Sequence, residues 1–306
     1  MRAVLNLMSI IGWSLMLFVF GTVIGSFLNV VASRYREDKF LFNSKILGGR
    51  SRCPQCRRQL RWYELIPLFS FLLQIGRCRG CGKNISWQYP IVEFLSVLIF
   101  LIPIYFYSYF QISQHILADH LLVWYYWLSA VWVLAGLLML LLSVIDYYHY
   151  LIPDETVIGI AVLGILGAFL KFYYQDLISW EASFVGHYAA LIAWPVNIFW
   201  SHIIAGLTGL LFFGLIFVAT KGRGMGFGDV KLAGAIGLLM GWPDSILAFA
   251  LAFIIGSIGG LILMALNRKK FRQPIPFGPY LVVGVFVTIF FGFQIVDYYF
   301  KLFGFL

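Results

Sequence analysis

Long apolar stretches recur along this chain from near its start almost to its end. A helix of about 20 apolar residues crosses the roughly 30 Å hydrocarbon core of a bilayer. Because the stretches repeat instead of stopping after one, they predict a polytopic all-α membrane protein, not a secreted protein with a single cleaved signal. The expected bundle has about eight transmembrane helices, at residues 8–31, 91–110, 121–145, 156–172, 199–219, 229–242, 245–266 and 279–300.

One polar segment interrupts the pattern after the first span, at residues 32–90. It contains about a dozen Lys and Arg residues, the basic bias typical of a cytoplasmic loop, and all four cysteines. The composition, 61% hydrophobic and 11% charged, excludes an ordinary soluble domain. We therefore expect a first transmembrane span at 1–31, a cytoplasmic loop domain at 32–90 and a transmembrane domain at 91–306.

The distribution of charge orients the spans. The net charge is +9, and the basic residues lie in loops. By the positive-inside rule, residues 32–90 stay in the cytoplasm, and alternation places the basic connections 221–228 and 267–276 on the same face. The apolar stretch 184–198 is short for a span, and we interpret it as interfacial or re-entrant. Since no nucleic-acid-binding motif accompanies the basic loops, the charge does not indicate a nucleic-acid partner.

The four cysteines form two CxxC units, Cys53–Cys56 and Cys78–Cys81. Each unit can direct two thiolates at one point, and four thiolates satisfy the tetrahedral preference of Zn(II) in a closed structural site. A cytosolic loop disfavours disulfides, and a thioredoxin-like redox role would require a βαβ pattern that the sequence lacks. The spacing therefore predicts structural zinc, which would help a polar loop to fold.

Two aspartates stand at the ends of expected spans. Asp146 ends the third span and Asp229 begins the sixth, and the charge-derived topology places both at the cytoplasmic edge of the membrane. Two carboxyl groups that meet can share a proton and act as base and acid on one water, the chemistry of an aspartic protease. Glycines at 224, 226 and 228 leave room for an extended substrate backbone beside Asp229.

Simpler interpretations of these acidic residues remain open. Asp146 and Asp229 could be ordinary helix-end residues, with Asp229 capping its helix. Asp154 and Glu155 are alternative members of a catalytic pair, although their position after Pro153 favours helix capping. Lys231 could favour an ionised carboxylate nearby, but we expect it to extend toward lipid phosphate.

The motifs together resemble one family over nearly the whole chain. GSFLNVVASR, CPQC, IPLFSFLLQIGRCRGC, YPIVE, SVID, LIPDE, GMGFGDVKL and PFGP are similar to motifs of the bacterial type IV prepilin leader peptidase/N-methyltransferase family. The GxGD signature alone also occurs in presenilin-like and archaeal preflagellin peptidases. The cysteine loop distinguishes the bacterial family from both.

The resemblance implies a GxGD-type aspartic peptidase in the bacterial cytoplasmic (inner) membrane, with Asp146 and Asp229 as its catalytic residues. Its substrates would be type IV prepilins or type II secretion pseudopilins, cut at the cytoplasmic boundary of their own transmembrane helix. The resemblance also implies S-adenosylmethionine-dependent methylation of the new N-terminus. It assigns this methyltransferase activity to the loop at 32–90 and the peptidase activity to the transmembrane domain at 91–306. We place no binding site for this cofactor, and only Glu64 and Glu93, near the family motifs, are candidates. Trp62 and Gln88 are among the departures from the family pattern.

Three other functions compete with this one. A GxGD protease for another class of membrane substrate would not require the cysteine loop. A proton-coupled transporter would place its acidic residues near the bilayer midplane, within repeat-related helices that this sequence does not show. A noncatalytic assembly scaffold would tolerate Asn at either aspartate. Pro276, Gly278 and Pro279 precede the last span, and we expect this irregular loop to position an extended precursor.

Overall fold

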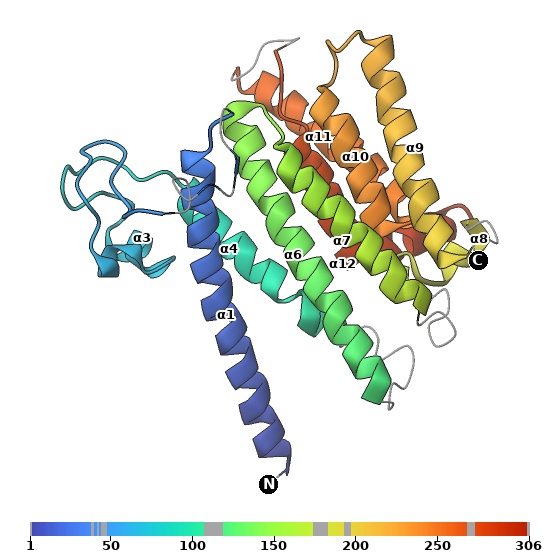
Figure 1. Cartoon of the computed structure of the whole chain (residues 1–306), viewed down its shortest axis with the longest axis horizontal. Helices are drawn as coiled ribbons and strands as arrows, with labels where there is room; N and C mark the ends of the chain where they lie inside the picture. The colour runs from blue at the N-terminus through green and yellow to red at the C-terminus, as the bar shows by residue number, and fades with distance from the viewer. Residues whose placement is uncertain are drawn as a thin grey trace. The chain divides into compact units, whose positions relative to one another are not determined.

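The chain is mainly helical where its structure is described. The computed structural model describes residues 2–37, 40, 41, 43, 48–106, 119–173, 183–192, 197–267 and 273–304. Within them the only β-structure is two isolated bridges, so the predicted all-α membrane fold is confirmed. The chain forms two compact units, Met1–Ile112 and Ser113–Leu306 (Figure 1).

The first unit contains two long helices that pack closely. Gly21 and Gly25 lie where α1 meets α4, and a Cβ built on Gly25 would lie only 2.7 Å from Cα of Glu93. Small residues allow two membrane helices to approach in this way. Asn29 adds a hydrogen bond from its side chain to the carbonyl of Tyr89, at 3.2 Å. The unit comprises α1 (Arg2–Arg34), the 3-10 helix η1 (Trp62–Leu65), α3 (Phe69–Leu73) and α4 (Gln88–Phe100).

The second unit is a bundle of six helices joined at its two ends, with two short elements between α7 and α9. The α6–α7, α9–α10 and α11–α12 connections lie at the same end of this bundle (Figure 1). The helices are α6 (Asp119–His149), α7 (Asp154–Tyr173), α9 (Ile198–Ala219), α10 (Phe227–Met240), α11 (Asp244–Ala265) and α12 (Gly278–Leu302), and the short elements are η3 (Gly186–Tyr188) and α8 (Ala189–Ile192).

Helices form at all eight expected span positions, but one of them is short. Among the described residues, 7 helices are long and apolar enough to cross a membrane. The exception is α10, whose 14 residues extend only about 21 Å. The span that begins with α4 continues past that helix and covers Gln88–Phe106, 19 residues. In the stretch 184–198, the described residues form only η3, α8 and the start of α9, and residues 193–196 lie outside the described part of the chain.

Short as it is, α10 lies in the interior of its unit. Most of its residues are buried, and glycines on both sides allow its neighbours to approach closely. A Cβ on Gly237 would lie 2.2 Å from the carbonyl oxygen of Ala205 in α9, and a Cβ on Gly164 of α7 would lie 2.7 Å from the Leu238 carbonyl carbon. Its apolar side chains therefore face protein more than lipid.

We expect Gly237→Ala to destabilise the protein by about 1–3 kcal/mol, because overpacking a tight contact forces backbone shifts. The new methyl group would overlap the backbone of α9. Thermal unfolding in detergent measures the loss. Gly214→Ala is the matched control, since its Cβ would meet nothing closer than 3.9 Å; an equal Tm for the two variants would contradict the packing argument.

A buried acidic residue organises the opposite end of this unit. Asp244, the first residue of α11, accepts hydrogen bonds from the Ser183 hydroxyl at 2.7 Å and from the backbone N–H groups of Phe184 and Val185 at 3.1 and 3.2 Å. Lys171 of α7 is also buried and interacts electrostatically with Asp244. These bonds fasten the segment before η3 to the start of α11.

Candidate active site and metal centre

Asp146 lies in the last turn of α6, at the end of the bundle where the three connections gather. Its side chain is buried, and its Oδ2 accepts a hydrogen bond from the backbone N–H of Gly278 at 3.0 Å. Gly278 begins α12, directly after the N-cap residue Phe277, and a Cβ at this position would lie 2.7 Å from Asp146 Oδ2. The contact therefore requires glycine.

Asp229 lies in the first turn of α10 and is also buried. Its Oδ2 accepts a hydrogen bond from the backbone N–H of Gly226 at 3.2 Å, while its own N–H donates to the Gly226 carbonyl at 3.2 Å. Asp229 thus caps its helix, as the simpler interpretation expected, and a helix N-terminus also favours a negative charge there. This capping bond does not prevent the Asp229 carboxyl group from interacting with Asp146 of α6.

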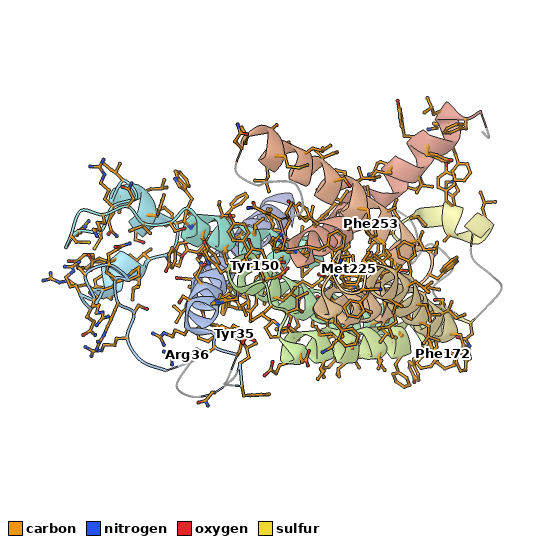
Figure 2. The ribbon with its side chains drawn as sticks, turned by 90° about the horizontal axis from the view of Figure 1, so that it is seen from above. Tyr35, Arg36, Tyr150, Phe172, Met225 and Phe253 are labelled. Atoms are coloured by element: carbon orange, nitrogen blue, oxygen red, sulfur yellow. The ribbon has the colours of Figure 1, made fainter. Side chains whose placement is uncertain are left out.

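The structure brings the two aspartates together from α6 and α10. Their carboxyl groups are close enough to interact electrostatically. Ile152, in the α6–α7 connection, lies against both glycines that flank them: a Cβ on Gly228 would be 3.1 Å from Ile152 Cβ, and one on Gly278 would be 3.5 Å from its Cδ1. Figure 2 labels Tyr150 and Met225, which belong to two of the connections around this site.

The neighbouring charged residues form a separate pair. Lys231 donates a hydrogen bond to Asp154 Oδ1 at 2.7 Å, and its ammonium group lies 5.2 Å from the centre of the Phe227 ring. The side chain of Asp154 is 63% exposed, unlike the two buried aspartates. Lys231 therefore bonds to another residue of the protein, which differs from the expected extension toward lipid. Asp154 forms its ion pair with this lysine.

The four cysteines of the loop converge on one point. The sulfur atoms of Cys53, Cys56, Cys78 and Cys81 all lie within 4.8 Å of one another. None of these four cysteines forms a disulfide. Four sulfur ligands at this spacing fit a tetrahedral metal ion with no position left open.

The two CxxC units have the same backbone structure. The N–H of Cys53 bonds to the Arg58 carbonyl and the N–H of Cys78 bonds to the Lys83 carbonyl, each at 2.9 Å. Arg57 and Gly82, at equivalent positions, both have positive φ. A backbone N–H from Gly80 reaches Cys78 Sγ at 3.4 Å and, with a second from Cys81, lowers the pKa of that thiol to about 7, which favours the thiolate that a metal requires.

The two glutamates near the family motifs have partners within the first unit. Glu64 is buried and accepts hydrogen bonds from the Arg61 backbone N–H at 2.8 Å and from the Arg58 guanidinium. These bonds hold the pKa of Glu64 below its ordinary value. Glu93 accepts a hydrogen bond from the Leu68 backbone N–H at 2.7 Å. Both carboxylates therefore fasten the loop to itself or to α4.

Sequence reasoning missed the N–H of Gly278 as a partner of Asp146. The sequence analysis had predicted instead that the loop before α12 positions the precursor. The available signal was a glycine between two prolines at the same face as both aspartates. Sequence reasoning also missed Arg58, whose guanidinium links Glu64 to the second cysteine unit, where a Cβ on Gly80 would lie 2.9 Å from Arg58 Nε.

The fold defines a multi-pass helical membrane protein with two buried carboxyl groups at one end of a bundle and a thiol cluster in a separate unit. Residues 19–107 match the bacterial peptidase A24 N-terminal domain, and residues 132–261 match the type IV leader peptidase family. The chain belongs to the type IV leader peptidase family, as its motifs had indicated.

Curated relatives bear the name prepilin leader peptidase/N-methyltransferase. The one from Stutzerimonas stutzeri is 32% identical, covering 92% of this chain and 91% of the relative. The one from Pseudomonas aeruginosa is 31% identical, covering 93% and 92%. The one from Bacillus subtilis is 29% identical, covering 94% and 97%. No solved structure matches the chain significantly.

Proposed function

We propose that this protein removes the leader peptide of type IV prepilins or type II secretion pseudopilins and then methylates the new N-terminus. The observation that carries the peptidase part is that Asp146 and Asp229 are both buried, lie near enough to interact electrostatically and each accept a hydrogen bond from a glycine N–H. Family membership supports the substrate class and the second activity.

In this mechanism the two carboxyl groups share one proton. The ionised partner takes a proton from a water molecule, which attacks the scissile carbonyl, while the protonated partner polarises that carbonyl and then helps to protonate the leaving amine. Gly278 and Gly226 keep the carboxylates oriented without adding charge. Burial within the bundle limits competing contacts with bulk water.

The purified protein in liposomes tests both activities. We expect mass spectrometry of a pilin-like precursor to show loss of the leader and, with S-adenosylmethionine present, the added mass of one methyl group. A control membrane substrate without a leader should remain intact. Cleavage of the control at the same rate would favour a protease of broader substrate class.

S-adenosylmethionine would supply the methyl group. The relatives' names support its use, and the family resemblance makes the first unit, which contains residues 32–90, its proposed place of action. Glu64 and Glu93 both bond within that unit, so we assign neither residue to the methyl donor. Their proposed role is to hold the loop in shape.

We propose that Cys53, Cys56, Cys78 and Cys81 bind one structural Zn(II). The support is the convergence of four sulfurs within 4.8 Å and the matching backbone of the two units. A closed four-thiolate site leaves no position for substrate, so the metal would fold the loop and take no part in peptide cleavage.

Elemental analysis tests the metal assignment. We expect one zinc per chain in the wild type, and nearly complete loss in Cys78→Ser, because a site with three thiolates binds far less tightly. Gln55→Ala is the matched control, since Gln55 is exposed in the first CxxC unit and bears no thiol. Full zinc content in Cys78→Ser would contradict the four-cysteine site.

We also propose that the active site faces the cytoplasm. The basic loops before α4, between α9 and α10 and between α11 and α12 support this orientation through the positive-inside rule. Asp146 lies near the end of α6 and Asp229 near the start of α10, and Figure 1 shows these helix ends on the same side of the second unit as the start of α12.

A further inference from the structure

The cysteine loop exposes an unusual amount of apolar surface. Residues 62–75 form η1, α3 and the turns beside them. Within this segment Ile75 is 83% exposed, Trp62 78%, Leu73 74% and Leu72 68%. Large apolar patches on the extramembrane part of a protein mark contact with a partner or a membrane. We therefore expect another molecule or a membrane to cover the exposed apolar side chains of residues 62–75.

The position of the segment within the first unit points to the bilayer. The Leu68 N–H, one residue before α3, bonds to Glu93, which lies five residues into α4, or roughly 8 Å along the helix axis. Glu93 also accepts a hydrogen bond from Ser26 of α1, eight residues before the end of that helix. The segment thus folds back beside two spanning helices.

A ring contact places α3 itself at the start of a span. Phe71, the buried residue of α3, packs against Trp87 with ring centroids 5.0 Å apart. Trp87 immediately precedes α4 and is 69% exposed, a position typical of the aromatic belt at a membrane interface. Figure 1 shows α3 on the side of the loop that faces back along α1, not beyond its C-terminal end.

The charges around the segment match a lipid surface. Arg61 and Arg77 are exposed and flank it on either side. Its one acidic residue, Glu64, is buried and bonded to Arg58. An exposed apolar face bordered by arginines is the pattern of an interfacial segment, which buries its apolar residues at the headgroup boundary and attracts anionic lipids.

We propose that residues 62–75 insert into the headgroup region of the same leaflet from which the cysteine loop emerges, with Arg61 and Arg77 contacting anionic lipid phosphates. The apolar side chains of α3 would then hold the loop at the membrane surface. This inference stands apart from the catalytic assignment, since it uses only contacts of the first unit.

Depth-dependent fluorescence quenching tests the proposal on the full chain in nanodiscs without any substrate. An environment-sensitive fluorescent amino acid replaces Leu73 in one protein and Gln55, exposed in the first CxxC unit, in its matched control. Lipids brominated near the headgroup should quench the probe at position 73 several-fold more than the probe at position 55. Equal quenching at the two positions would overturn the insertion.

Two further comparisons separate the lipid from other occupants and test the charges. A probe at position 73 that stays unquenched by lipid and becomes shielded only when a pilin-like precursor is added would mean that the face binds substrate, and would overturn the proposal.

Adding phosphatidylglycerol should strengthen the quenching, and Arg61→Gln/Arg77→Gln should remove that increase while leaving zinc content unchanged. An increase of equal size in the variant would overturn the proposed role of the two arginines.

Discussion

Asp229→Asn is expected to lower the rate of leader removal by roughly 10³-fold or more, and Asp146→Asn to do the same, because loss of a positioned acid or base alone costs 10²–10⁴-fold. Asparagine keeps the size of the side chain and its acceptor oxygen, so Gly226 and Gly278 can still donate to it. The loss should therefore appear in kcat with the fold retained.

Two controls separate chemistry from folding. Asp154→Asn removes a carboxylate at the same end of the bundle, but one that is exposed and paired with Lys231, so leader removal should stay near the wild-type rate. Thermal unfolding should be similar for all three variants. A large loss in Asp154→Asn with full activity in Asp146→Asn would transfer the catalytic role to the α7 residues.

Gly278→Ala is expected to lower kcat by roughly 10²-fold, the effect of displacing a reacting group by about 1 Å. The new Cβ would lie 2.7 Å from Asp146 Oδ2, so the carboxylate must move away from its N–H donor and out of its position in the site. Steady-state kinetics on a pilin-like precursor measure the change, with KM changing much less than kcat.

The matched control for this variant is Gly260→Ala, in which the added Cβ would meet Ile275 at an ordinary 3.5 Å. It should retain its kcat. An unchanged kcat in Gly278→Ala would mean that Asp146 does not depend on this contact. A raised KM with normal kcat would instead restore the expectation that the loop binds the precursor.

Much of the architecture could be predicted because membrane burial leaves a simple record in the sequence. Long apolar runs identified the spans, and charge bias placed Asp146 and Asp229 at one face before any contact was known. The CxxC spacing predicted that four thiols would converge, and they do. In each case a local pattern determines the result.

The features that could not be predicted from the sequence are contacts between residues far apart along the chain and the surroundings of individual helices. Hydropathy cannot distinguish an apolar helix facing lipid from one facing protein, so the short, enclosed α10 resembled an ordinary span. The bond from Gly278 to Asp146 joins residues 132 positions apart, and no local pattern specifies it. The composition of the segment 32–90 is polar overall, and composition does not show that Leu72 and Leu73 are exposed on α3.

The most direct test of the central claim compares leader removal by Asp146→Asn, Asp229→Asn and the double variant in the same liposomes. Catalytic groups that act as one unit are strongly non-additive. If the two aspartates share one water and one proton, the double variant should be no slower than either single variant. Losses that multiply, or either single variant cleaving at the wild-type rate, would contradict a shared catalytic pair.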